Sequence, residues 1–351
     1  MFRYLFALLL IVFSVFLTEC DKEDDSGTKI TSLKLELSKN RIVGDSIDYA
    51  KVTVTSQDGV NVIDLVKIYY RGAEFVGNNI RSAIPSQSTV YAMYNDIKSN
   101  EAALEVVEDR NLKFVKNVLM EQYTGTWCGW CPRAIFQIST LEKTDPYIVH
   151  VAHHLSDEMT YNLNMSLFQS FSFTGVPTVH ADRNIVWQGN ISDINKLHSP
   201  SRVGITLDVS GTAQMISAKV DVKFGYDFTE ELKLSVYLLH DSLVSTQANY
   251  YNTDPASPWY QAGATMQNFI HRNVMMKSGT DMFGDVIPSS AIDIGSIYTK
   301  KVDFTSFTSN DLNKMVVVAF VTWGNGSKSG QVNNVAVARP GQKVEFRYSG
   351  N

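Results

Sequence analysis

Hydrophobic and polar residues alternate over short stretches in the first part of the chain. The alternation begins at Ile30 and runs to Leu37, and it returns between Asp48 and Thr55. A period of two residues is typical of half-buried strands. Further β-rich runs, separated by turn residues, lie at 66–70, 88–95 and 104–107. The pattern predicts a small Ig-like β-sandwich over residues 28–110, with the role of a spacer or adhesive module.

Strand-like and helix-like stretches take turns from about residue 111. An apolar run from Val115 to Gln122 is followed by a helix-like run from Ala134 to Lys143. More strand and helix patterns follow at 147–152, 159–171, 185–187 and from 192 onward. Alternating strands and helices imply a sheet covered by helices, so residues 111–199 are predicted to form an α/β domain.

The last part of the chain returns to strand patterns. The runs lie at 203–209, 217–224, 232–239, 302–307, 315–321 and 332–338. They predict an antiparallel β-sandwich or jelly roll over residues 200–351. A long polar loop is expected from Ser242 to Gln267, and it carries the aromatic residues Tyr250, Tyr251, Trp259 and Tyr260. These rings would bind a glycan or protein ligand, or pack on their own sandwich.

The N-terminus has the pattern of a targeting segment. Arg3 precedes an almost wholly apolar run from Tyr4 to Leu17. Such a run is typical of a signal peptide, here residues 1–19, and the alternative is an uncleaved anchor helix. The segment ending at Cys20 resembles a lipoprotein lipobox, which implies that Cys20 carries a lipid.

An acidic tether is expected over residues 20–27, directly after the signal peptide. Its sequence from Asp21 to Asp25 resembles the export signal of Bacteroidetes-type surface lipoproteins, although a short charge run is also an ordinary solvated tether. These features predict a lipid-anchored protein of the outer membrane that faces the cell surface or the periplasm.

Composition adds two limits. The chain has 351 residues, of which 44% are hydrophobic and 19% charged, so it has enough apolar material for several domains. Its net charge of -5 gives no support for nucleic-acid binding, which needs a basic surface.

The cysteines supply the candidate chemistry. Of the three in the chain, Cys20 is assigned to the lipid, which leaves Cys128 and Cys131 as a close pair. A disulfide that closes so small a loop stabilises a long chain very little. Cys128 would precede the helix, where free backbone N–H groups favour a thiolate. The spacing therefore predicts Cys128 as a nucleophile and Cys131 as the resolving thiol.

A metal site is the rival interpretation of the cysteines. His150, His153 and His154 follow the pair, and zinc sites use such residues. However, His150 and His153 would point to opposite faces of one strand, so no metal is predicted. His154 would lie at the sheet edge near the dithiol and modulate its charge, or be an ordinary strand histidine.

Two motifs carry a family resemblance. The residues Trp127 to Cys131 and Gly175 to Thr178 resemble the paired signatures of the thioredoxin superfamily. The resemblance implies that Cys128 and Cys131 are redox-active, that Trp127 belongs to the active site, and that Pro177 is cis and shapes a substrate groove. The family often places an acid six residues before the first cysteine. This chain has Gln122 there, with Glu121 beside it as a possible modulator.

The order of the parts resembles a second family, the 28-kDa outer-membrane-protein-related lipoproteins of Bacteroidetes type. The local matches are the stretches 121–128, 177–178, 182–183, 236–239 and 269–272, together with His154. The resemblance implies an outer-membrane lipoprotein and leaves its molecular activity open.

Two functions follow from these observations. The first is a thiol-disulfide oxidoreductase that acts on thiols or disulfides of exported or surface proteins, with no cofactor beyond the Cys128–Cys131 disulfide. The second is a non-enzymatic surface adhesin or ligand-binding lipoprotein in which the same disulfide is structural.

Overall fold

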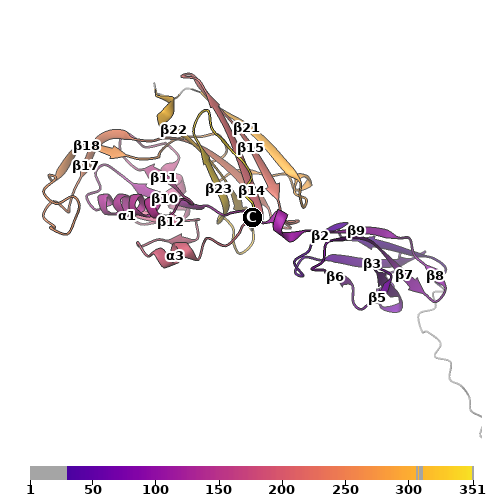
Figure 1. Ribbon diagram of the computed structural model, residues 1–351. Helices are drawn as coiled ribbons and strands as arrows, with labels where there is room; N and C mark the ends of the chain where they lie inside the picture. Colours follow the sequence, from indigo (N-terminus) through magenta and orange to yellow (C-terminus); the bar gives the residue numbers. More distant parts are fainter. Residues whose placement is uncertain (1–29, 306, 308–310, 350–351) are drawn as a thin grey trace, which may run out of the picture.

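The computed structural model describes residues 30–305, 307 and 311–349. The predicted signal peptide and the whole acidic tether, Cys20 included, lie outside these residues. The described chain has a slender N-terminal unit joined end-on to a larger body (Figure 1). Among the described helices, none has the length and apolar character that crossing a membrane requires.

The N-terminal unit consists of two β-sheets around one core. The first sheet has the order β1 (Leu33–Leu37), β3 (Ala50–Ser56) and β6 (Asn79–Ile80). The second runs β2 (Arg41–Val43), β9 (Ala102–Val107), β7 (Ser86–Tyr94), β4 (Lys67–Tyr70) and β5 (Ala73–Phe75), and β8 (Ile97–Lys98) pairs with β7. Two short 3-10 helices are η1 (Ile63–Leu65) and η2 (Asp109–Leu112), and η2 leads into the body. Alternate residues such as Val52 and Val54 are buried because strand side chains alternate between faces.

A nine-stranded sheet organises the body. Its main path has the order β13 (Ile185–Val186), β12 (Thr178–Ala181), β10 (Val118–Thr124), β11 (Ile148–His154), β19 (Val274–Ser278), β16 (Leu232–His240), β22 (Met315–Trp323) and β23 (Val332–Ala338). The ninth strand, β20 (Asp285–Val286), pairs with β16. Strands from both sides of residue 199 therefore share one sheet.

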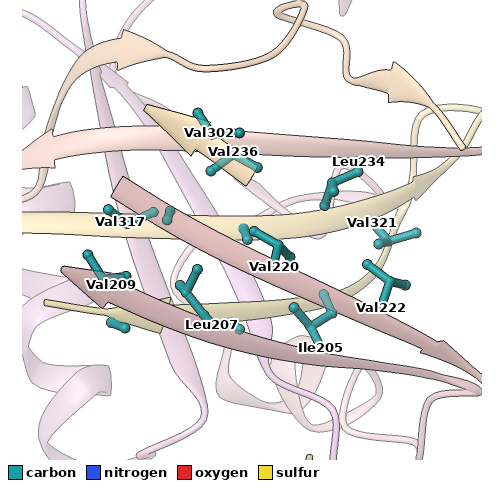
Figure 2. Packing of buried hydrophobic residues seen from close by; sticks show 14 of the residues in the cluster. Ile205, Leu207, Val209, Val220, Val222, Leu234, Val236, Val302, Val317 and Val321 are labelled. Carbon is teal, nitrogen blue, oxygen red and sulfur yellow. The ribbon is translucent and has the colours of Figure 1, made fainter. Parts of the chain in front are cut away.

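A second sheet covers part of one face. It has the order β21 (Ile297–Thr305), β15 (Met215–Phe224), β14 (Val203–Gly211) and β24 (Lys343–Val344). Its inner residues, including Leu207 and Val220, pack against Val236 and Val317 of the large sheet (Figure 2). Two 3-10 helices, η3 (Ser289–Ala291) and η4 (Leu312–Lys314), lie in the connections of this region.

Three α-helices cover the other end of the large sheet. Helix α1 (Cys131–Thr144) and the short α3 (Ile191–Asn195) bury Val118 and Met120 of β10. Helix α2 (Asn164–Ser170) packs on the opposite face with Tyr123 and Tyr237. It is shorter than the helix expected over 159–171.

The predicted fold class is wrong. The expected Ig-like sandwich, thioredoxin-like α/β domain and separate C-terminal sandwich do not describe a mostly β structure whose large sheet joins the central and C-terminal strands. The physical reason lies in the pairing of β11 with β19, at Ala152 and Val274, which continues the sheet instead of leaving an edge. A hydrophobic pattern predicts strands but not their partners.

The expected loop from Ser242 to Gln267 is also partly wrong. It begins with β17 (Leu243–Ala248) and ends within β18 (Thr265–His271), and the two strands pair as a hairpin. Only the segment between them, 249–264, is irregular.

Candidate dithiol site

The loop between β10 and α1 carries a disulfide between Cys128 and Cys131, with Cα atoms 5.4 Å apart. Cys131 is the first residue of α1, and Pro132 follows it where the helix needs no backbone donor. Cys128 is only 4% exposed and Cys131 is fully buried. The neighbouring Trp127 and Trp130 are about half exposed, whereas the disulfide itself is buried.

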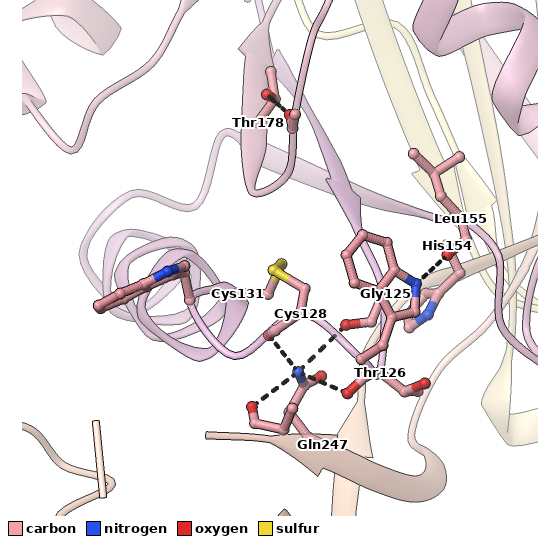
Figure 3. The surroundings of a disulfide bond; sticks show 12 residues. Gly125, Thr126, Cys128, Cys131, His154, Leu155, Thr178 and Gln247 are labelled. Atoms are coloured by element: carbon pink, nitrogen blue, oxygen red, sulfur yellow. Dashed lines mark hydrogen bonds between the residues drawn. A yellow bond between two sulfur atoms is a disulfide. The ribbon is translucent and has the colours of Figure 1, made fainter. Parts of the chain in front are cut away.

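A tight turn before β12 faces the disulfide. The Val176–Pro177 peptide bond is cis, and the Thr178 hydroxyl donates to the Gly175 carbonyl at 2.6 Å. Figure 3 shows Thr178 on the turn that lies opposite the sulfur atoms. A cavity of about 270 Å³ lies beside Pro177, and its walls include Trp130, Arg133 and Tyr251.

Gln247 of β17 holds the cysteine loop from the side opposite this turn (Figure 3). Its side-chain Nε2 donates to the Cys128 carbonyl at 2.9 Å and approaches the carbonyls of Gly125 and Thr126 at 3.3 Å. Two backbone bonds run alongside, from Ala248 N to Thr126 O at 2.8 Å and from Tyr250 N to Gly129 O at 3.0 Å.

Two tyrosines of the 249–264 segment pack on the same loop. The rings of Tyr250 and Tyr251 each lie 5.3 Å from the Trp130 ring in edge-on contact. A Cβ atom at Gly129 would overlap the Tyr250 ring, so the fit depends on glycine. Farther along, Trp259 packs on Phe269 of its own hairpin.

Trp127 and His154 lie on the β11 side of the loop. The Trp127 indole donates to the Leu155 carbonyl at 2.8 Å. His154 Nδ1 lies 2.7 Å from Asp157 Oδ2, which also accepts from the Thr126 N–H at 2.9 Å. Burial raises the pKa of Asp157, but its bonds to His154 and Thr126 outweigh burial and lower it. His154 is thus linked to the cysteine loop through Asp157.

Glu121 is not part of the dithiol site, because it points to the opposite face of β10 from Gln122. It is fully buried and receives hydrogen bonds from Arg183 at 2.7 and 2.8 Å, and His153 Nε2 lies 3.1 Å away. Burial raises the pKa of Glu121, but the Arg183 charge and these hydrogen bonds hold it below its ordinary value. Arg183 comes from the β12–β13 turn, where it has a positive φ.

The histidines of β11 are divided between the two faces of the sheet. His150 Nε2 lies 3.1 Å from Gln122 Oε1 on the α1 face, whereas His153 contacts Glu121 and Asn164 on the other. Burial, followed by the charge of Arg272, lowers the pKa of His150 to about 3. Within the part of the chain that the structure describes, no cluster of three or more His, Cys, Asp or Glu side chains is arranged around a metal position.

The structure brings together Trp127, Cys128, Cys131 and Pro177. His154 is connected to them through its contact with Asp157. The structure leaves Glu121 on the far side of the sheet, and Cys20 lies outside the described residues. Sequence reasoning missed Gln247 and Asp157, and it included Arg183 only within the matched stretch 182–183, without its bonds to Glu121. The aromatic segment after Ser242 was noticed, but its position on the cysteine loop has no local signal in the sequence.

Fold and site together define a mostly β protein of several sheets with a Cys-x-x-Cys disulfide at the start of a helix. Residues 164–344, more than half of the chain, match the family described as outer membrane protein Omp28. The chain belongs to the Omp28 family, and it is an outer membrane protein.

Solved structures give a likeness in fold. HBP35 of Porphyromonas gingivalis is 19% identical with a TM-score of 0.52, covering 68% of this chain and 78% of its own. A domain of the outer membrane lipoprotein Omp28 from Porphyromonas gingivalis is 16% identical with a TM-score of 0.26, covering 40% of this chain and 88% of its own. No curated protein matches the sequence.

Proposed function

We propose that this outer membrane protein exchanges disulfides with thiols of exported or surface proteins through Cys128 and Cys131. The observation that carries the proposal is the placement of the disulfide at the N-terminus of α1, opposite the Val176–Pro177 turn and beside a cavity. The free N–H groups of the first turn of α1 favour a thiolate at Cys128. A purely structural disulfide that closes so short a loop would add little to the stability of the fold.

The reaction balances without a further cofactor. A substrate thiolate attacks Cys128 Sγ, which forms a substrate–Cys128 disulfide and releases Cys131 as a thiolate. A second substrate thiolate then attacks the substrate sulfur, releases Cys128 and leaves the substrate oxidised. In the reverse direction, the Cys128 thiolate attacks a substrate disulfide and Cys131 resolves the mixed disulfide. Two electrons pass in either case.

Purified protein should be assayed for insulin reduction with dithiothreitol and for refolding of a scrambled disulfide substrate. We expect Cys128→Ser to lose both activities, and Cys131→Ser to accumulate a mixed disulfide at Cys128. Cys20→Ser is the matched control, since it removes a cysteine but keeps the pair. Equal activity of Cys128→Ser and the wild type would refute the proposal and favour a structural disulfide in an adhesin or binding protein.

A further inference from the structure

The β17–β18 hairpin contacts the cysteine loop along its backbone, although more than a hundred residues separate them. Gln247, Ala248 and Tyr250 supply donors to the carbonyls of the loop, so the hairpin holds four positions around Cys128, namely residues 125, 126, 128 and 129. These contacts lie on the side of the loop away from the Pro177 turn.

Gln247 reaches the loop because of an irregularity in the hairpin. The register shifts between Ser245 and Gln247, where β18 contributes an additional residue, and Asn268 there has a φ of 55°. A bulge of this kind twists a hairpin and re-aims a side chain. Gln247 is fully buried, and its Nε2 is directed at the carbonyl oxygens of the loop.

We infer that Gln247 is a positioning residue for the Cys128–Cys131 pair, and that docking of the hairpin stabilises the disulfide relative to the dithiol. The inference rests on the proposed exchange reaction. The disulfide restricts the backbone from Cys128 to Cys131, so the Cys128 and Gly129 carbonyls face the hairpin donors. Reduction removes that restriction, and the loop then loses entropy when the hairpin docks.

The coupling is reciprocal. If the hairpin binds the oxidised loop more tightly than the reduced loop, the oxidised loop must hold the hairpin more tightly by the same factor. Loss of the Gln247 donors should therefore shift the equilibrium toward the dithiol, and reduction of the wild type should loosen the hairpin.

The test measures the equilibrium constant for oxidation of the protein dithiol by oxidised glutathione, with thiol trapping as the readout. Gln247→Met keeps the side-chain length but removes both donors, and we expect the constant to fall roughly fivefold to tenfold. Tyr250→Leu, at an exposed position, removes the ring over Gly129 and should lower the constant less. Ile270→Ala, on the exposed side of β18, is the control and should leave it unchanged.

Hydrogen exchange of the wild type provides the second measurement. The amides of Ala248 and Tyr250 should exchange faster after reduction, whereas those of the β14–β15 pair should not change. If Gln247→Met does not fold, the inference is tested by the equilibrium constant of Tyr250→Leu and by the hydrogen exchange of the wild type in its two redox states. Unchanged constants in folded variants, or equal exchange in both redox states, would overturn the inference. A wild type that equilibrates with glutathione but processes no protein substrate would instead count against the proposed function.

Discussion

At the scale of single residues, the main electrostatic constraint is the buried carboxylate of Glu121. Arg183 pairs with it through two hydrogen bonds and also reaches the Tyr237 hydroxyl at 3.2 Å. Tyr237 in turn donates to the Met282 carbonyl at 2.7 Å. The network therefore ties the β12–β13 turn to β10 and β16, and it stabilises the large sheet where its central and C-terminal strands meet.

Arg183→Met should lower the free energy of unfolding by about 3–5 kcal/mol, because it leaves the Glu121 charge buried without its partner. Denaturant unfolding measures the loss. The double variant Glu121→Gln with Arg183→Met removes both charges and should recover a large part of it. Equal stability of the single and double variants would show that the loss comes from packing and not from the unpaired charge.

His150 predicts the pH dependence of stability. The pKa of His150 in the folded protein is about 3, whereas the ordinary pKa of histidine is near 6.5. Between these two pH values His150 is protonated in the unfolded chain and neutral in the folded protein, so protonation favours unfolding. The free energy of unfolding is therefore unaffected by His150 above pH 6.5, and it decreases as the pH falls from 6.5 toward 3. The loss at pH 5 is about 2 kcal/mol.

His150→Gln checks this prediction when unfolding is measured from pH 7 to pH 5. The variant should lose less stability over that interval than the wild type. His180 and His271, with pKa values lowered by burial to about 4, contribute in the same direction in both proteins. Parallel pH profiles would contradict the assignment to His150.

At the scale of elements, the contact between the hairpin and the cysteine loop depends on Gly129. Gly129→Ala should displace Tyr250 and weaken hairpin docking by about 1–3 kcal/mol, since the new methyl group overpacks the contact. Faster hydrogen exchange at the Tyr250 amide would report the displacement. Adding Tyr250→Ala makes room for the methyl group and should restore the amide exchange of Ala248. Wild-type exchange in Gly129→Ala would contradict the close packing.

The local elements were accessible from the sequence. The expected strand 115–122, helix 134–143 and strand 147–152 lie close to β10, α1 and β11. These predictions succeed because apolar periodicity is a local property. The cysteine and proline motifs were equally visible, because each occupies a few adjacent positions.

Long-range pairing was not accessible. Ala152 of β11 pairs with Val274 of β19. A hydrophobic period of two residues identifies each strand, but it does not show which distant strand is its partner. Gln247 gives no signal either, since its role arises from a register shift in a hairpin that lies far along the chain from Cys128. The fold class was therefore wrong at the point where distant strands select their partners.

At the scale of the whole molecule, a small interface joins the N-terminal unit to the body. Its apolar part is the cluster of Val43, Leu112 and Ile294. Ion pairs surround it, with Lys39 lying 3.1 Å from Asp227 and Arg202 lying 3.1 Å from Asp45. Small polar interfaces permit motion between units, so these ion pairs are expected to set the angle between the unit and the body.

Attachment to the outer membrane is predicted to depend on Cys20. Cys20→Ala should abolish incorporation of labelled fatty acid and release the mature chain from the membrane fraction, because no acyl chain would hold it there. Cys128→Ala is the control and should remain labelled. A Cys20→Ala protein that stays in the membrane at a higher mass would indicate an uncleaved anchor helix.

Arg202 tests the interface between the two parts. It lies 3.1 Å from Asp45 of the N-terminal unit and 2.6 Å from Asp109 of η2, so Arg202→Met removes both ion pairs while keeping most of the apolar stem. Loss of these partly exposed pairs should weaken the docking by about 1 kcal/mol and increase the radius of gyration in small-angle X-ray scattering. High salt should expand the wild type in the same direction, since it screens the same charges. Lys34→Met breaks a pair with Glu36 inside the N-terminal unit and should leave the scattering unchanged. Identical scattering of Arg202→Met and the wild type at low salt would mean that the apolar cluster alone sets the angle between the parts.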